Sequence, residues 1–284
     1  MSFSFYVSAP DPPRFSAVVD ALAMPDCACV EDTPADDIWH EGSFFHFYTR
    51  GCSAREVEVN LEDGRFRVRI MTCCTRADHL LALRFVDTIA RMTGGAIEPE
   101  QGPPVTVDDR QAHFGDEWVA TMTAHGPKAV IAMVDRDGQT LTMSGPRRPF
   151  YMGPRFLKEL RARGSDMPLE ERILDAMVRL QGVDEDEYHP AAVLQVAPKG
   201  GGNSISLAAW AAGVAYLFPA VQYLALMVEG STELLVPQPM GPRIAGEAWT
   251  WMDERHALVE ATALEDWPEL CARASEHGVK DPFS

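Results

Sequence analysis

Two runs of carboxylates are the residues in this chain whose clustering points most clearly to a function. Acidic side chains occur with no Lys or Arg between them from residue 26 to residue 41, and again from residue 184 to residue 187. Clustered acids attract a basic partner over long range and raise its association rate. We therefore expect a partner-binding surface formed by Asp26, Glu31, Asp32, Asp36, Asp37, Asp184, Glu185, Asp186 and Glu187. The alternative is an acidic surface that only keeps the protein in solution.

Histidines are the second group with chemical potential, because imidazole titrates near neutral pH. Eight are present, and none stands in a motif that pairs it with a nucleophile or a metal. The sequence therefore predicts no catalytic residue. An enzyme would need a pocket that gathers residues such as His40, His46 or His189 with a perturbed carboxylate.

Metal and cofactor motifs have the wrong spacing throughout. Cys27 and Cys29, with His40 and His46 nearby, lack the paired spacing of structural zinc sites. In the glycine-rich stretch 199–204 the lysine precedes the glycines, whereas in a phosphate-binding P-loop it follows them. The acidic run 184–187 lacks the glycine and final glutamate of a calcium loop. We expect no metal and no cofactor, and scattered cysteines in the reduced state.

Composition and charge set the broad class. The 284 residues are 46% hydrophobic and carry a net charge of −17, which fits a soluble globular protein and opposes nucleic-acid binding. The first residues lack a signal-peptide pattern, so we expect a cytoplasmic protein. The uncharged stretch 200–228 is interrupted by Pro219 and polar residues, which favours buried strands over a membrane span. Basic charge is concentrated in Arg147, Arg148, Arg155, Lys158, Arg161 and Arg163.

The clearest structural element is a β-hairpin over residues 56–71. Polar and apolar residues alternate on both sides of Asp63-Gly64, a two-residue turn signal. The resulting register places Val57 opposite Ile70, Val59 opposite Val68 and Leu61 opposite Phe66 on one face. It pairs Glu58 with Arg69 and Glu62 with Arg65 on the other.

Further elements of the first half follow from periodicity and capping signals. We expect strands at 3–7, 43–49 and 96–98, a helix after Pro12-Pro13, and a helix opened by Thr75 and Asp78 and closed by Gly94-Gly95. This order predicts an antiparallel sheet with helices on one face. The prolines between residues 98 and 109 suggest a domain boundary.

The second half shows the same style of element. We expect a hairpin of 129–134 with 139–143 through Asp137-Gly138, a linker over 145–154, and helices at 155–163 and 169–180. Strands are expected at 192–196, 204–212, 221–228 and 233–236, and a last helix with a capping box of Asp266 and Glu269. The prediction is an α+β protein with two sheet-plus-helix halves, mainly antiparallel, at 1–125 and 126–284. Whether the halves pack as one unit stays open.

Three segments carry a resemblance. The helix at 75–95, the strand at 217–226 and the ending at 265–270 resemble those of uncharacterised bacterial cytosolic proteins, myxobacterial ones especially. Acidic α+β proteins without a catalytic motif are similar to the immunity proteins that neutralise bacterial toxins. The resemblance implies a binding protein that occludes a toxin's active site, with a basic protein as partner and with neither nucleic acid nor membrane. It transfers no site residue. The alternative is a small-molecule-processing enzyme without a recognisable motif.

Overall fold

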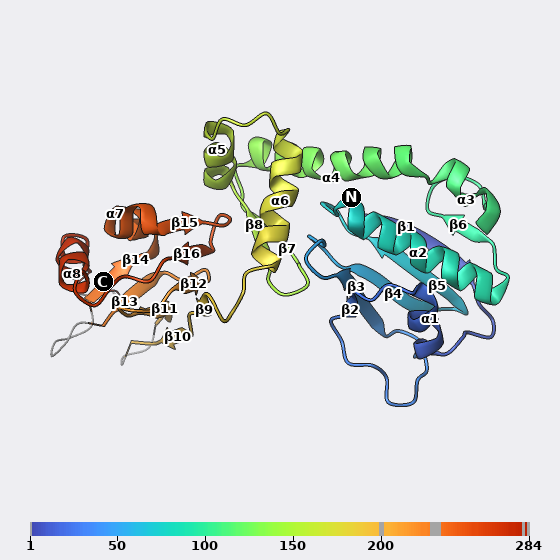
Figure 1. Cartoon of the computed structure of the whole chain (residues 1–284), viewed down its shortest axis with the longest axis horizontal. Helices are drawn as coiled ribbons and strands as arrows, with labels where there is room; N and C mark the ends of the chain where they lie inside the picture. Colours follow the sequence, from blue (N-terminus) through green and yellow to red (C-terminus); the bar gives the residue numbers. More distant parts are fainter. Residues whose placement is uncertain (1, 199–201, 228–233, 280–281, 283–284) are drawn as a thin grey trace. The chain divides into compact units, whose positions relative to one another are not determined.

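The computed structural model describes residues 2–198, 202–227, 234–279 and 282. The chain forms two compact units, Met1–Gly182 and Val183–Ser284 (Figure 1). Helices and mainly antiparallel strands occur in both units. The protein therefore belongs to the α+β class, as the sequence predicts.

The first unit is built on a six-stranded sheet in the order β2-β3-β4-β5-β1-β6, with every neighbouring pair antiparallel. Its strands are β1 (Phe3–Ser8), β2 (Cys27–Cys29), β3 (Phe44–Thr49), β4 (Val57–Glu62), β5 (Arg65–Ile70) and β6 (Ile97–Pro99). The predicted hairpin is confirmed with its register, since Val57 faces Ile70 and Glu58 faces Arg69. Asp63 and Gly64 both have positive φ, 51° and 67°, as a type I′ turn requires.

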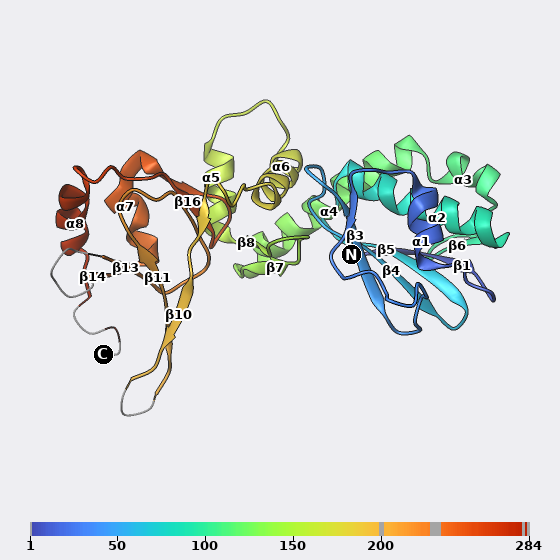
Figure 2. The same cartoon turned by 60° about the horizontal axis from the view of Figure 1, so that its bottom comes forward.

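Two helices, α1 (Phe15–Leu22) and α2 (Arg76–Thr93), cover one face of this sheet (Figure 2). Thr75 and Asp78 form a capping box at the start of α2, and Gly94 ends the helix at φ 70°. The apolar residues of β4 and β5 point into the core under these helices. Their polar residues alternate onto the opposite face, which we call the polar face.

The next two helices are α3 (Val107–His113) and α4 (Asp116–Asp137). The predicted hairpin over residues 129–143 is wrong here, because residues 129–134 continue α4. Val119, Val130 and Val134 are buried along this helix, at a spacing that suits one helical face. Gly138 ends α4 at φ 64°. The Asp137-Gly138 pair therefore terminates a helix instead of turning a hairpin.

The predicted boundary between residues 125 and 126 lies inside α4, and the compact units divide after Gly182 instead. The proline-containing loop before α3 is no linker either, because Arg110 of α3 forms an ion pair with Asp87 of α2 at 2.5 Å. Unit 1 continues through four elements that follow α4. These are β7 (Leu141–Met143), β8 (Phe150–Met152), α5 (Pro154–Ala162) and α6 (Leu169–Gln181). The last two confirm the helices predicted there.

The second unit contains two four-stranded sheets, in the orders β10-β11-β13-β14 and β15-β16-β12-β9. Its elements are β9 (His189–Pro190), β10 (Val193–Val196), β11 (Ile205–Trp210), β12 (Tyr216–Phe218), β13 (Tyr223–Leu226), β14 (Leu234–Pro237), α7 (Gly241–Ala245), β15 (Trp249–Trp251), β16 (Ala257–Val259) and α8 (Trp267–Ser275). The core is aromatic, with the Trp210 ring 5.9 Å from Phe218 and 6.0 Å from Trp249, centroid to centroid.

The strands predicted for this part of the chain correspond to β10, β11, β13 and β14, while residues 228 and 233 lie outside the described residues. β11 and β13 pair with each other and are largely buried, as expected for the uncharged stretch. Of the glycine-rich loop, residues 199–201 also lie outside the described part. Asp266 precedes α8 but makes no side-chain capping bond, so the capping box is wrong. Within the described residues, no helix has the length and apolar character to cross a membrane.

Candidate functional site

Residues 26–41, which we call the acidic segment, run from β2 toward β3 at the edge of the first sheet. Three of its carboxylates bind to the rest of the unit. Glu31 contacts His46, Asp37 contacts Ser16, and Glu41 accepts a hydrogen bond from the backbone of Asp63 at 2.6 Å. The segment is therefore held at three points and carries its remaining acids in a defined arrangement.

Asp37 anchors the start of α1. Its two carboxylate oxygens accept hydrogen bonds from the Ser16 N–H and the Ser16 hydroxyl, each at 2.7 Å, and its carbonyl accepts one from the Phe15 N–H. These bonds from Ser16, with Arg14 nearby, hold the pKa of Asp37 below its ordinary value. Asp37 has φ 58°, a left-handed conformation that aspartate tolerates better than most residues. Asp37, which the sequence predicts at a partner contact, therefore has a structural role at the start of α1.

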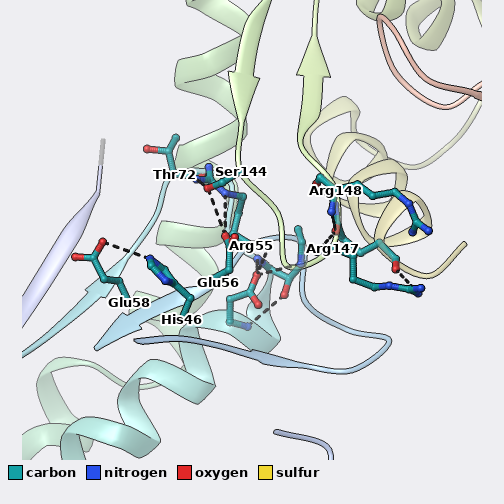
Figure 3. A network of polar contacts seen from close by, with 12 residues as sticks. His46, Arg55, Glu56, Glu58, Thr72, Ser144, Arg147 and Arg148 are labelled. Atoms are coloured by element: carbon teal, nitrogen blue, oxygen red, sulfur yellow. Dashed lines mark hydrogen bonds and ion pairs between the residues drawn. The ribbon is translucent and has the colours of Figure 1, made fainter. Parts of the chain in front are cut away.

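Glu31 forms the second anchor, through His46 of β3. The His46 Nδ1 lies 2.5 Å from Glu31 Oε1, and the His46 backbone N–H donates to Glu31 Oε2 at 2.7 Å. On its other side, His46 Nε2 lies 3.8 Å from Glu58 Oε2 (Figure 3). Glu58 in turn lies 3.9 Å from Arg67 and 3.7 Å from Arg69. We call these five residues the His46 network.

The charges in this network stabilise one another. The carboxylates of Glu58 and Glu31 raise the pKa of His46 to about 9. The His46 imidazole, together with Arg69 and Arg67, holds the pKa of Glu58 below its ordinary value. Partial burial acts to raise the pKa of Glu31, but hydrogen bonds from His46 outweigh it and lower that pKa. At neutral pH the network is a protonated imidazole between two carboxylates.

The centre of the polar face has hydrogen-bonding capacity that the described residues do not use. Glu58 and Asn60 are 6% and 1% exposed, and each has a buried side-chain oxygen without a hydrogen-bond partner there. The buried Nε atoms of Arg67 and Arg69 are also without one. Buried polar atoms are normally paired, so these four atoms are exceptions to that rule.

The other predicted residues of the acidic segment are exposed. Asp36 pairs with His40 at 2.9 Å, and neither the Asp26 nor the Asp32 carboxylate has a partner within the described chain. Exposed apolar side chains accompany them, with Val30 at 49%, Ile38 at 51% and the nearby Phe44 at 47%. This combination of free charge and exposed apolar surface is typical of interfaces.

The second predicted acidic run belongs to the other unit. Asp184, Glu185, Asp186 and Glu187 are exposed in the connection between α6 and β9. Asp184 organises this turn, because its Oδ1 accepts a hydrogen bond from the Asp186 N–H and its carbonyl accepts one from Tyr188. The Tyr188 hydroxyl donates to Glu260 at 2.5 Å.

The two cysteines within the acidic segment, Cys27 and Cys29, remain protonated thiols. Burial raises the pKa of Cys27 to about 11 and that of Cys29 to about 12. Cys29 Sγ donates to Glu31 at 3.5 Å, so this thiol belongs to the surroundings of the His46 network. In the part of the chain that the structure describes, no group of three or more His, Cys, Asp or Glu residues is arranged to hold a metal ion.

One polar network was not expected from the sequence. Arg55 is 7% exposed and donates to the Thr72 carbonyl and the Ser144 hydroxyl, both at 2.9 Å (Figure 3). Ser144 donates to Glu56 at 3.4 Å, and Arg55 lies 3.9 Å from the same carboxylate. The only sequence signal is an adjacent Arg-Glu pair before β4. That pair reveals nothing of Ser144, which lies 89 residues from Arg55.

The fold and the site define an acidic α+β protein with a charged sheet face and an anchored acidic edge. Residues 24–181 match a protein family described as "Domain of unknown function (DUF4299)". This match covers more than half of the chain, so the chain belongs to that family. The match ends at the last residue of α6, beside the division between the two units. Neither the curated proteins nor the solved structures gave a match.

Proposed function

We propose that this chain is a binding protein that forms a stoichiometric complex with a basic protein, and that the acidic segment is its contact surface. The observation that carries the proposal is that some carboxylates of the segment bind to the rest of the unit while others stay exposed. Glu31, Asp37 and Glu41 hold the segment in place, while Asp26 and Asp32 remain exposed beside apolar side chains.

This arrangement suits recognition for two physical reasons. A segment that is already ordered loses little conformational entropy on binding, so more of the contact energy contributes to affinity. Exposed carboxylates attract a basic partner before contact and raise the association rate, while apolar side chains such as Ile38 and Phe44 supply buried area afterwards.

We propose further that the partner is a toxin and that the chain acts as its immunity protein by covering the toxin's active site. Two features support this role, the net charge of −17 and the grouping of acids on an anchored segment. Carboxylates presented in this way can pair with the Lys and Arg side chains that a nucleic-acid-cleaving or phosphate-binding toxin uses for its substrate.

The His46 network weighs against the rival proposal of an enzyme. Its two flanking carboxylates raise the pKa of His46 to about 9, so the imidazole is protonated at neutral pH and has no free nitrogen to accept a proton. The other histidines named as candidates do not join it. His40 pairs with Asp36 at the surface, and His189 is exposed in the second unit.

The test uses the full chain as bait for lysate and secreted proteins of its host, followed by kinetics with the captured partner. Asp26→Asn combined with Asp32→Asn should slow association about threefold to tenfold, because two steering charges are lost. The matched control, Asp166→Asn with Asp175→Asn, changes the net charge equally at exposed positions of the same unit. It should leave the rate close to that of the unmodified protein.

Three outcomes would count against the proposal. Equal slowing by both pairs would mean that only net charge matters. A second result would place the contact in the second unit. In that case association would slow only when Asp184, Glu185, Asp186 and Glu187 are neutralised. Absence of any stoichiometric, salt-sensitive partner would remove the binding function and favour a small-molecule activity.

A further inference from the structure

A pocket of about 260 Å³ lies in the first unit, between the turn that follows β3 and the C-terminal end of α6. Its charged lining residues are Arg50 and Arg147, and among the described residues that line it none carries a carboxylate. In a chain with a net charge of −17, a pocket lined by two arginines stands out. We call it the arginine pocket.

The turn side of the pocket offers several unused hydrogen-bond donors. Arg50 is exposed, and its guanidinium has no hydrogen-bond or ion-pair partner within the described chain. The hydroxyl of the half-buried Tyr48 has no hydrogen-bond partner there either. The Gly51 N–H, at φ 70° in the turn, makes no hydrogen bond to described residues either. Thr49 Oγ1 is buried without a partner, although buried hydroxyls are normally paired.

The opposite side of the pocket is rigid. The Arg147 backbone N–H donates to Gln181 Oε1 at 2.9 Å, and Arg147 Nη1 donates to the Gln181 carbonyl at 3.2 Å (Figure 3). Gln181 Nε2 donates to the Arg148 carbonyl at 2.9 Å. The loop that carries Arg147 is thereby fixed to the end of α6, so its cationic side chain is held at the pocket wall before any ligand arrives.

We propose that the arginine pocket binds the phosphate group of a small ligand. A guanidinium can bind phosphate with two parallel hydrogen bonds, and the backbone N–H and hydroxyl donors suit the remaining oxygens. The donors come from two facing walls, which matches a tetrahedral anion better than a flat carboxylate. The volume is below the range usual for drug-sized ligands, so the ligand is a small phosphorylated molecule or phosphate itself.

A second pocket in the same unit, of about 450 Å³, shows that this charge pattern is not general. Arg76 and Lys128 line it, but so do Glu170 and Glu171. In that pocket Arg76 pairs with Asp116 at 2.7 Å and Lys128 with Glu170 at 4.0 Å. Carboxylates line that pocket, whereas none of the described residues that line the arginine pocket carries one.

The test measures binding of inorganic phosphate to the full chain by titration calorimetry, with acetate as the carboxylate probe. Saturable phosphate binding is expected, together with a shift of the Gly51 amide resonance. Arg50→Ala should weaken binding about tenfold or more, since it removes a charged donor. Thr49→Val should weaken it by a smaller factor.

Arg163→Ala is the matched control, because it removes an exposed arginine elsewhere in the unit. It should leave phosphate affinity unchanged, and the unfolding midpoint of Arg50→Ala should match that of the unmodified protein. The proposal is overturned if phosphate does not bind saturably, if acetate binds as tightly, or if Arg163→Ala weakens binding as much as Arg50→Ala. These results are independent of whether the acidic segment binds a protein.

Discussion

His46 Nδ1 lies 2.5 Å from Glu31 Oε1, and this contact joins the acidic segment to strand β3 of the first sheet. Fifteen residues separate the two side chains in the sequence. Their pairing fixes where the segment lies relative to β3. His46 is therefore one of three points that hold the exposed acids in place, beside the contacts of Asp37 and Glu41.

The first prediction concerns the pH dependence of this contact. Because the pKa of His46 is raised to about 9 in the folded protein, its contribution to stability is fully present below about 6.5 and is lost as the pH rises through about 9. The pKa of Glu31 is lowered in the folded protein. Its carboxylate therefore contributes fully to stability at pH values above the ordinary glutamate pKa, and this contribution is lost as the pH falls through the lowered pKa.

His46→Gln should therefore lower the free energy of unfolding near pH 6 by about 1 kcal/mol, a modest value because the pair is partly open to water. The difference from the unmodified protein should shrink toward pH 10. Denaturant unfolding of both proteins between pH 6 and pH 10 measures this difference in the free energy of unfolding. His40→Gln, which removes an exposed imidazole, is the control and should stay close to the unmodified protein. A difference that does not change with pH would contradict the charged pairing.

The second prediction separates two neighbouring carboxylates that look alike in the sequence. Asp37 holds the start of α1 through Ser16, whereas Asp36 makes only an exposed pair with His40. Asp37→Ala should lower the thermal unfolding midpoint clearly, because helix α1 loses its anchor and alanine is disfavoured at φ 58°. Asp36→Ala should have little effect. Equal midpoints for the two variants would show that Asp37 does not anchor the helix.

Local patterns predict much of the first sheet. The register of β4 with β5 follows from alternation and a two-residue turn, so every facing pair could be named in advance. The capping box of Thr75 and Asp78 is equally local. In contrast, α4 was not foreseen, because the apolar run 129–134 suits a buried strand as well as a helix. Its length, from Asp116 to Asp137, decides between them.

The candidate sites depend on contacts that no local pattern encodes. Clustering identified the acids, but it could not show that Asp37 would bind Ser16, 21 residues earlier. The arginine pocket joins a turn after β3 to a loop before β8, so its two arginines come from distant parts of the chain. Such pairings depend on tertiary packing, so sequence patterns identify Arg147 only as part of a basic stretch.

The third prediction concerns the buried Arg55. It bonds to the Thr72 carbonyl and to Ser144, and it thereby connects the start of β4 with the end of β7. Arg55→Met should destabilise the protein by about 3 kcal/mol, because the Glu56 carboxylate is left buried beside an apolar side chain. Arg65→Met is the matched control. Arg65 is exposed and pairs with Glu98, so its loss should cost less than about 1 kcal/mol. Similar losses in denaturant unfolding would contradict a buried network.

The last prediction tests the course of α4 beside the first sheet. A Cβ atom on Gly126 would lie 2.7 Å from the backbone nitrogen of Cys73 and 3.3 Å from its Cα, so the helix and the chain after β5 approach too closely for a side chain. In the middle of a free helix, Gly→Ala stabilises by about 1 kcal/mol. Here Gly126→Ala should instead destabilise, by about 1–3 kcal/mol, because backbone must move to admit the methyl group.

Gly164→Ala is the control for this substitution, since no atom lies within 4 Å of a Cβ placed there. Its effect on the free energy of unfolding should stay within about 0.5 kcal/mol. Denaturant unfolding of the two variants gives the comparison. A stabilising effect of Gly126→Ala would mean that α4 does not pass against Cys73. A clear loss of stability in Gly126→Ala, beside a nearly unchanged Gly164→Ala, would support the close packing of α4 against Cys73.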